Sequence, residues 1–263
     1  HEQQQYLQDL FERYNYHTIK RHVDFNQGLD ARLFTMEKAQ QLSKLALKPC
    51  RIAFDDINTQ EEYFSAMSLA VQSGIYHFSN YLLFNYKDNP KDLWNRLFLN
   101  IDFCEKHPKI KSLFSFPMKY ASIEHTDRSY IGVLWNKKYL KSINVILNVT
   151  SGVVPKEKNF FFRAFGRSVD EYLEILVMPD DYIRYRDYFE KAGLIQRWTE
   201  EYRKLTRGER EELVAILSTV DTETAAVEQK HSSALNGILL FYTVKKSKME
   251  QNRFYYLRLL DVQ

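Results

Sequence analysis

The sequence predicts an α/β fold, with a parallel sheet that alternates with helices and is followed by a mainly helical carboxyl-terminal region. Two observations favour this class. Short apolar segments recur through the first half of the chain at intervals of about 26 to 32 residues, and an amphipathic helical segment separates each from the next. Beyond Pro117 the pattern changes to consecutive helical segments. We therefore expect two domains, 1–136 and 137–263.

The elements of the first half begin with a predicted helix over residues 2–15, whose apolar side chains share one face. Thr35 suits the N-cap of the next helix, and Thr59 with Glu62 matches the capping-box pattern of a third. Asn89 before a proline is typical of the start of a fourth. We expect strands at Arg21–Phe25, Arg51–Phe54, Phe78–Asn85 and Ile110–Phe116, and helices over 36–46, 59–73 and 89–106.

The second half is predicted to be helical almost throughout, with Gly193 separating two of the helices. The polar stretch 220–237 indicates a linker or an irregular loop, and 238–262 fits a strand as well as a helix. The expected helices cover residues 137–149, 157–165, 169–177, 180–192, 194–205 and 207–218.

The composition is typical of a soluble, cytoplasmic protein. A net charge of +3 gives no electrostatic reason to expect nucleic acid or an anionic membrane as a partner. No apolar run approaches the ~20 residues of a membrane span, and no signal peptide is recognisable. Cys50 and Cys104 are too few for a disulfide framework or a four-thiolate metal site. The aromatic content of 15% fits a thick core or, alternatively, a surface on which bases stack.

Several catalytic motifs are missing from the sequence. It contains no phosphate-binding loop, no dinucleotide-binding glycine motif and no nucleophile elbow. Its histidines are scattered without metal-ligand spacing. These features give no support to a P-loop nucleotide hydrolase, a serine or cysteine hydrolase, or a metal site within the chain.

Polar side chains follow the first predicted strand, at the edge of a parallel sheet where binding loops converge. Asn26 and Gln27 can donate and accept hydrogen bonds, and Arg32 offers a planar fork for a carboxylate. Gly28 allows the backbone a positive φ. We interpret this loop as ligand-binding. The alternative is a strand-to-helix turn in which Asp30 pairs with Arg32.

The other predicted strands also end in polar side chains. Asp55 follows the second strand, where it is either a site residue or part of a helix cap. The third strand carries polar residues among apolar neighbours, and a ligand is one way to satisfy their hydrogen bonds. Tyr120 follows the fourth strand, and a later polar cluster is explained equally well as a structural loop. These further candidates are Ser79, Asn80, Asn85, Asp127 and Arg128.

Several blocks of the sequence resemble a poorly characterised group of radical S-adenosylmethionine proteins. Together they cover most of residues 20–190, and the first and third are the most specific. The resemblance implies a partial parallel (β/α) barrel in 1–136, in which the four predicted strands are strands three to six. The blocks are VDFNQGLDARLFT (23–35), RIAFDD (51–56), SNYLLFNYKDNPKDLWNRL (79–97), FSFPMKY (114–120) and DRSYIGVLWNKKYL (127–140).

The resemblance implies two cofactors, S-adenosylmethionine and a [4Fe–4S] cluster. In that family they generate a 5′-deoxyadenosyl radical, which here would act on an unknown substrate. The family's CxxxCxxC cluster motif is absent from this chain, so the chain is either part of a longer enzyme or has lost catalysis. By position, the resemblance assigns cofactor binding to Asn26, Gln27, Asp30, Arg32, Ser79, Asn80 and Asn85, and substrate contact to Asp55, Tyr120, Asp127 and Arg128.

Two other functions stay open. One is a non-catalytic binding or scaffold module, with a partner or a missing segment covering the open sheet edge before Arg21. The other is an RNA-modifying or RNA-binding protein, suggested by aromatic and basic residues interleaved in 135–139 and 182–188. Charged helices that carry tyrosines explain those segments more simply, so nucleic acid is not the partner we expect.

Overall fold

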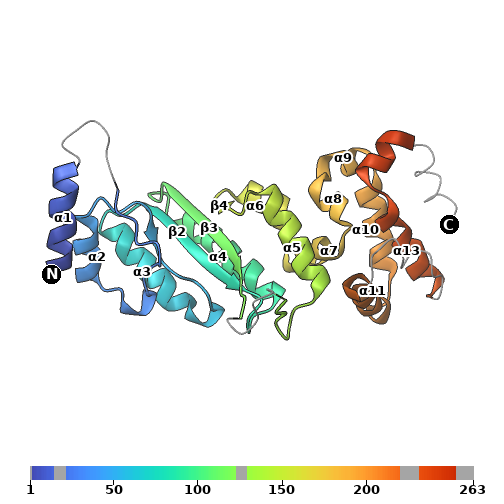
Figure 1. The fold of residues 1–263 in the computed structure, drawn as a ribbon, viewed down its shortest axis with the longest axis horizontal. Coiled ribbons are helices and arrows are strands. Elements are labelled where there is room, and N and C mark those ends of the chain that lie inside the picture. The colour runs from blue at the N-terminus through green and yellow to red at the C-terminus, as the bar shows by residue number, and fades with distance from the viewer. Residues whose placement is uncertain (1, 15–21, 123–128, 220–230, 253–263) are drawn as a thin grey trace. The chain divides into compact units, whose positions relative to one another are not determined.

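The computed structural model describes residues 2–14, 22–122, 129–219 and 231–252 (Figure 1). The chain divides into two compact units. The first comprises His1–Leu134 and Gly152–Ala164, and the second comprises Trp135–Ser151 and Phe165–Gln263. Each unit is therefore assembled from two separate stretches of the chain. The predicted domains 1–136 and 137–263 stay a prediction.

The first unit contains a four-stranded sheet in the order β1–β2–β3–β4 (Figure 1). Its strands are β1 (Cys50–Arg51), β2 (His77–Phe84), β3 (Ser112–Lys119) and β4 (Val154–Pro155). The first three run parallel, and β4 pairs antiparallel with β3. Helix α3 (Gln60–Gln72) connects β1 to β2, and α4 (Pro90–Lys106) connects β2 to β3. The predicted α/β class, with strands and helices alternating along an open sheet, is confirmed.

The prediction of a regular first strand at Arg21–Phe25 was wrong. Among the described residues of this segment, Val23 makes one isolated parallel bridge with Leu47. A second isolated bridge joins Leu29 to Ile52. The chain thus follows the edge of β1, but a turn at residues 26–27 interrupts the pairing. Arg21 and the preceding residues 15–20 lie outside the described residues, so the partner or missing segment expected to cover the sheet edge before Arg21 stays a prediction.

β4 is an element that the sequence does not predict. It pairs only Pro155 with Phe114 and Val154 with Ser115. A strand of two residues is too short to show the alternation of apolar and polar residues by which a strand is predicted. The sheet is therefore parallel over three strands and closes on its far edge with a short antiparallel strand.

Helices α3 and α4 cover one face of the sheet. The other helices of this unit are α1 (Glu2–Tyr14), α2 (Met36–Ser43) and α6 (Lys158–Phe165). A buried network fixes the covering pair, because Asn80 Nδ2 on β2 donates to the Tyr63 hydroxyl of α3 at 2.6 Å. That hydroxyl donates to Asn100 Oδ1 of α4 at 2.8 Å, and Asn100 in turn donates to Ser115 on β3. Alternate residues of β2 and β3 therefore face the helices, and the residues between them face away.

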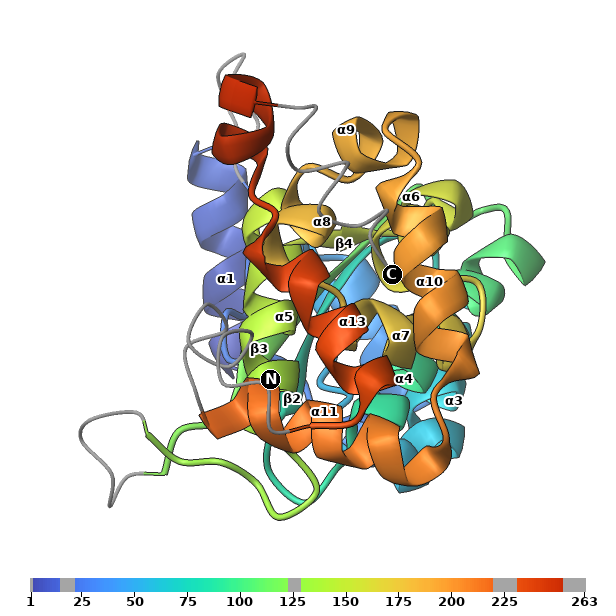
Figure 2. The same cartoon turned by 90° about the vertical axis from the view of Figure 1, so that its right-hand side faces the viewer.

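The second unit is built from helices (Figure 2). They are α5 (Lys137–Val149), α7 (Val169–Val177), α8 (Asp180–Arg184), α9 (Arg186–Lys191), α10 (Leu194–Lys204), α11 (Arg207–Thr219) and α13 (Ser233–Thr243). α5 packs against α7, α8 and α11, and α10 lies beside α13. At the centre, the buried ammonium of Lys138 donates to Met178 O at 2.7 Å and to Asp180 Oδ1 at 2.9 Å. Both charges of this pair are satisfied, as buried charges must be.

The predicted helical carboxyl-terminal region is confirmed, with changes at three places. The helix predicted over 180–192 is divided at Tyr185, whose φ of −115° and ψ of 45° leave the helical range. The linker predicted for 220–237 was wrong at its end, because α13 begins at Ser233. In 238–262, for which the sequence left strand and helix open, residues 238–243 and 246–252 are helical, and residues 220–230 and 253–263 lie outside the described ranges.

No described helix combines the length and the hydropathy that crossing a bilayer requires.

Candidate functional site

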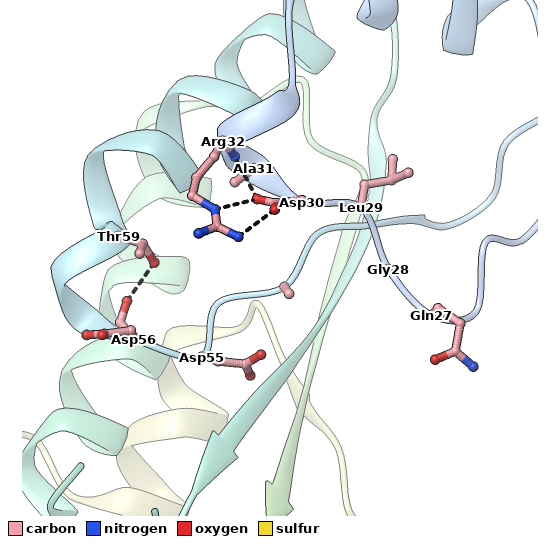
Figure 3. Close-up of a pocket in the computed structure, with 10 residues that line it drawn as sticks. Gln27, Gly28, Leu29, Asp30, Ala31, Arg32, Asp55, Asp56 and Thr59 are labelled. Carbon is pink, nitrogen blue, oxygen red and sulfur yellow. Dashed lines mark hydrogen bonds and ion pairs between the residues drawn. The ribbon is translucent and has the colours of Figure 1, made fainter. Parts of the chain in front are cut away.

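A pocket of about 320 Å³ lies at the carboxyl end of β1 (Figure 3). One wall comes from the loop that bridges to β1, and the other from the segment that follows β1. Polar members of the lining are Gln27, Asp30, Arg32, Asp55, Asp56 and Thr59. The volume is at the lower end of the range for small-molecule sites, and the carboxyl edge of a parallel sheet is where such sites usually form.

The first loop is held against β1 by backbone hydrogen bonds. Gly28 N donates to Phe25 O at 2.8 Å and closes a tight turn, and Leu29 N donates to Arg51 O at 2.8 Å. Gly28 has a φ of +81°, a conformation that residues with a Cβ rarely adopt. The sequence-based interpretation of this glycine is confirmed, because the positive φ turns the chain from the β1 edge into the pocket wall.

Asp30 and Arg32 form an ion pair on that wall (Figure 3). Arg32 Nε donates to Asp30 Oδ1 at 2.9 Å, and Arg32 Nη2 donates to Oδ2 at 2.6 Å. These hydrogen bonds lower the pKa of the Asp30 carboxyl and raise that of the Arg32 guanidinium. Asp30 also caps the short 3₁₀ helix Ala31–Leu33 by accepting from Arg32 N. The pairing of Asp30 with Arg32, which was the alternative to a ligand-binding loop, is therefore present. Both side chains still line the pocket.

The opposite wall carries two consecutive carboxylates. Asp55 Oδ1 accepts a hydrogen bond from Leu83 N at 2.9 Å, so this side chain continues the pairing of β1 with β2 beyond the end of the strand. Asp56 caps the 3₁₀ helix Ile57–Thr59 by accepting from Asn58 N at 2.9 Å. Both side chains are exposed. The pocket thus offers acidic acceptors on both sides and one guanidinium.

Two further predicted site residues lie outside the pocket lining, Asn26 in the turn before β1 and Ser79 on β2. Asn26 Oδ1 accepts from the Tyr81 hydroxyl at 3.1 Å. Ser79 Oγ accepts from Arg51 Nη1 at 3.0 Å. Arg51 also binds Asp24 through two hydrogen bonds of 2.7 and 2.8 Å, which lower the pKa of the Asp24 carboxyl. These residues form one polar network on the sheet face that points away from α3 and α4.

The remaining predicted residues serve the scaffold as far as the structure describes them. Asn80 is fully buried on the helix-covered face. Asn85, with a φ of 69°, uses its amide to hold Tyr120 O, Tyr130 O and Gly132 N. The Tyr120 ring packs against Tyr86 and Tyr130. Asp127 and Arg128 lie outside the described residues. Their proposed roles in ligand binding stay predictions.

The sequence did not predict the residues that hold the strands beside the pocket in place. Arg96 of α4 is fully buried and donates to Phe54 O, in the segment that follows β1, and to Leu83 O, near the end of β2. Arg51 lies in a strand that is otherwise apolar. A charged residue within an apolar stretch was the available signal in both cases, because such a charge must find partners in the fold.

The cysteines offer no metal ligands. Cys50 and Cys104 are free and buried, and burial raises the pKa of each thiol to about 12. Among the residues that the structure describes, no group of three or more His, Cys, Asp or Glu side chains could hold a metal ion. These two thiols therefore do not fit an iron–sulfur cluster.

In comparisons with known proteins, no family model, no curated protein and no solved structure matches the chain. What the protein does must therefore be argued from its own residues and from the geometry of the sheet and its pocket.

Proposed function

We propose that this chain is the cofactor-binding part of a radical S-adenosylmethionine enzyme, with S-adenosylmethionine bound at the β1 pocket of a partial (β/α) barrel. One observation carries the proposal. Four residues expected to contact cofactor or substrate, Gln27, Asp30, Arg32 and Asp55, line a single pocket although they come from two separate loops. The pocket lies at the carboxyl edge of parallel strands, where barrel enzymes bind their ligands.

The donors and acceptors of the pocket suit the groups of this cofactor. Asp30 and Asp55 carry oxygens that accept hydrogen bonds from an ammonium group or from ribose hydroxyls. The Nε–Nη2 edge of Arg32 is bound to Asp30, and its remaining N–H groups on Nη1 and Nη2 can donate to a ligand carboxylate. Gln27 can both donate and accept. The carboxylates also favour a cationic ligand, and the sulfonium centre of S-adenosylmethionine carries a positive charge.

The proposal assigns no radical step to this chain. In a complete enzyme of this kind, residues outside those that the structure describes would hold the [4Fe–4S] cluster, which would supply the reducing chemistry. The two buried cysteines here do not fit that role. What the described residues would do is hold the adenosyl ligand and orient it against the sheet.

The test measures equilibrium binding of S-adenosylmethionine and S-adenosylhomocysteine to the chain by isothermal titration calorimetry. We expect saturable binding of one ligand per chain, weakened about tenfold or more in Asp55→Asn and in Arg32→Gln. A matched control is Arg207→Gln in α11, which removes a similar exposed ion pair, with Glu211, in the second unit. That control should bind as the unaltered chain does.

No saturable binding up to about 1 mM ligand, where the binding free energy is about −4 kcal/mol, would overturn the proposal. A folded, monodisperse chain with that result would instead match a non-catalytic module derived from the fold. Equal loss of binding in the Arg207→Gln control would count against the β1 pocket as the binding place.

A further inference from the structure

The face of the sheet that points away from α3 and α4 carries a group of partly exposed aromatic and apolar side chains. Tyr81 pairs with Phe116, and Ser79 pairs with Phe114, in the parallel register of β2 and β3. Alternation places these residues on the same face. Phe114 is 42% exposed and Met118 is 48% exposed, whereas Ser115 and Pro117 on the opposite face are buried. We call the residues Arg51, Tyr81, Phe114 and Phe116 the aromatic platform.

Arg51 is held in place within the aromatic platform. Its guanidinium carbon lies 5.4 Å from the centre of the Tyr81 ring and 5.9 Å from that of Phe116. Asp24 and Ser79 fix its orientation through three hydrogen bonds. The Tyr81 ring is fixed at its far end by the bond to Asn26. Rings and guanidinium planes that are held in place are the surfaces on which unpaired bases stack.

Positive charge gathers at the amino-terminal end of the same strands. His77 is the first residue of β2 and hydrogen-bonds Ser112, the first residue of β3. Burial lowers the pKa of His77, and the nearby side chains of Lys48, Lys111 and His22 lower it further. All three of these neighbours are exposed. Lysines at the amino-terminal end of the strands that carry these rings complement a chain that alternates phosphates with bases.

We propose that a single-stranded nucleic acid lies along this face, with bases stacked on the aromatic platform and phosphates near Lys48 and Lys111. If the nucleic acid is the substrate, the inference rests on the proposed function, since the bound nucleic acid would lead a nucleotide toward the β1 pocket. If the nucleic acid only binds here, the inference rests on the aromatic platform alone. The residues differ from the tyrosine-bearing helical segments that the sequence singled out.

The experiment measures fluorescence anisotropy of a short labelled oligoribonucleotide, and of the oligodeoxyribonucleotide of the same sequence, with the full chain. We expect binding that weakens with added salt, and weakens about fivefold or more in Phe114→Ala through loss of one stacked base. The matched control is Phe160→Ala, because Phe160 on α6 is 39% exposed but lies outside the sheet. It should leave binding unchanged.

Charge is tested by the double variant Lys48→Gln, Lys111→Gln. The slope of log affinity against log salt should fall by about 1.4, the value for two phosphate contacts to a single strand. Lys204→Gln on α10, an exposed lysine of the second unit, is the control. Circular dichroism melts of each variant separate loss of binding from loss of folding.

Three results would overturn the inference. They are no salt-dependent binding of either oligonucleotide, equal binding of a duplex, or self-association of the chain that Phe114→Ala abolishes, which would assign the face to a second copy. S-adenosylmethionine binding, measured on the same samples, reports separately on the proposed function. Cofactor binding without nucleic-acid binding rejects only this inference, and the reverse result rejects only the proposed function.

Discussion

Arg96 connects the segment that follows β1 to the end of β2, next to the pocket. Its guanidinium donates to Phe54 O, Leu83 O and Asp88 Oδ2, each at 2.9 Å, and its side chain is fully buried. Burial lowers the pKa of Arg96, although nearby carboxylates oppose the shift, and the group stays charged. Since Leu83 N also donates to Asp55, Arg96 holds the strand ends from which that pocket carboxylate projects.

We expect Arg96→Met to lower the free energy of unfolding by about 3 to 5 kcal/mol, because it removes the buried guanidinium that donates to Asp88, Phe54 O and Leu83 O. Arg96→Lys should recover part of this loss, since an ammonium can reach fewer of the three acceptors. Urea unfolding of the purified variants measures both effects.

The control for Arg96 is Arg207→Met, where the side chain is 93% exposed. It should change the free energy of unfolding by less than about 0.5 kcal/mol. A loss below about 1 kcal/mol in Arg96→Met would show that the buried arginine does not hold the strand ends.

Two helices of the first unit begin in different ways. The sequence predicts a capping box of Thr59 with Glu62 at α3 and a cap followed by a first-turn proline at α4. At α4, Asn89 Oδ1 accepts from Asp92 N, and Asp92 Oδ2 accepts from Asn89 N, so a reciprocal capping box forms. At α3, the Thr59 side chain makes no capping bond. The 3₁₀ helix that Asp56 opens precedes α3 directly, and the Thr59 hydroxyl donates back to Asp56 O.

We expect Asn89→Ala to lower the free energy of unfolding by about 1 kcal/mol, the usual cost of losing an N-cap. Thr59→Ala should cost less than about 0.5 kcal/mol, because no cap is lost. Urea unfolding of the two variants side by side distinguishes them. Equal costs would mean that Thr59 caps α3 in solution, as its sequence pattern suggests.

The loop between Val23 and Arg32 shows how much of the site the sequence could predict. Gln27, Asp30 and Arg32 were expected to lie together, and the structure brings them into one pocket with Asp55. The regular strand expected before them is reduced to isolated bridges. Local polarity and a glycine reveal a loop, but only the neighbouring strand decides whether the preceding residues pair with it.

Across the whole molecule, both cysteines lie in the core of the first unit, at 0% exposure for Cys50 and 7% for Cys104. Thiol chemistry therefore reports on global folding. In the native protein at neutral pH we expect almost no reaction with a thiol reagent such as 5,5′-dithiobis(2-nitrobenzoate), because the thiols are buried and their pKa values of about 12 leave almost no thiolate.

In denaturant both thiols should react rapidly. The resulting count of two thiols per chain is the reference for the native sample. Rapid reaction of either thiol in the native protein would contradict the buried positions. Anaerobic treatment with iron and sulfide should likewise leave no cluster on the native chain.

The sequence by itself determined the α/β class, the position of most helices, and the polar loops at the strand ends, because periodicity, caps and glycine act over a few residues. Only the tertiary structure decided which strands pair, which face of the sheet the helices cover, and which polar side chains satisfy one another. Asn80 and Tyr81 are adjacent in sequence, yet one is locked inside the core and the other belongs to the aromatic platform. Successive strand residues point to opposite faces, and contacts distant in sequence choose which face is covered.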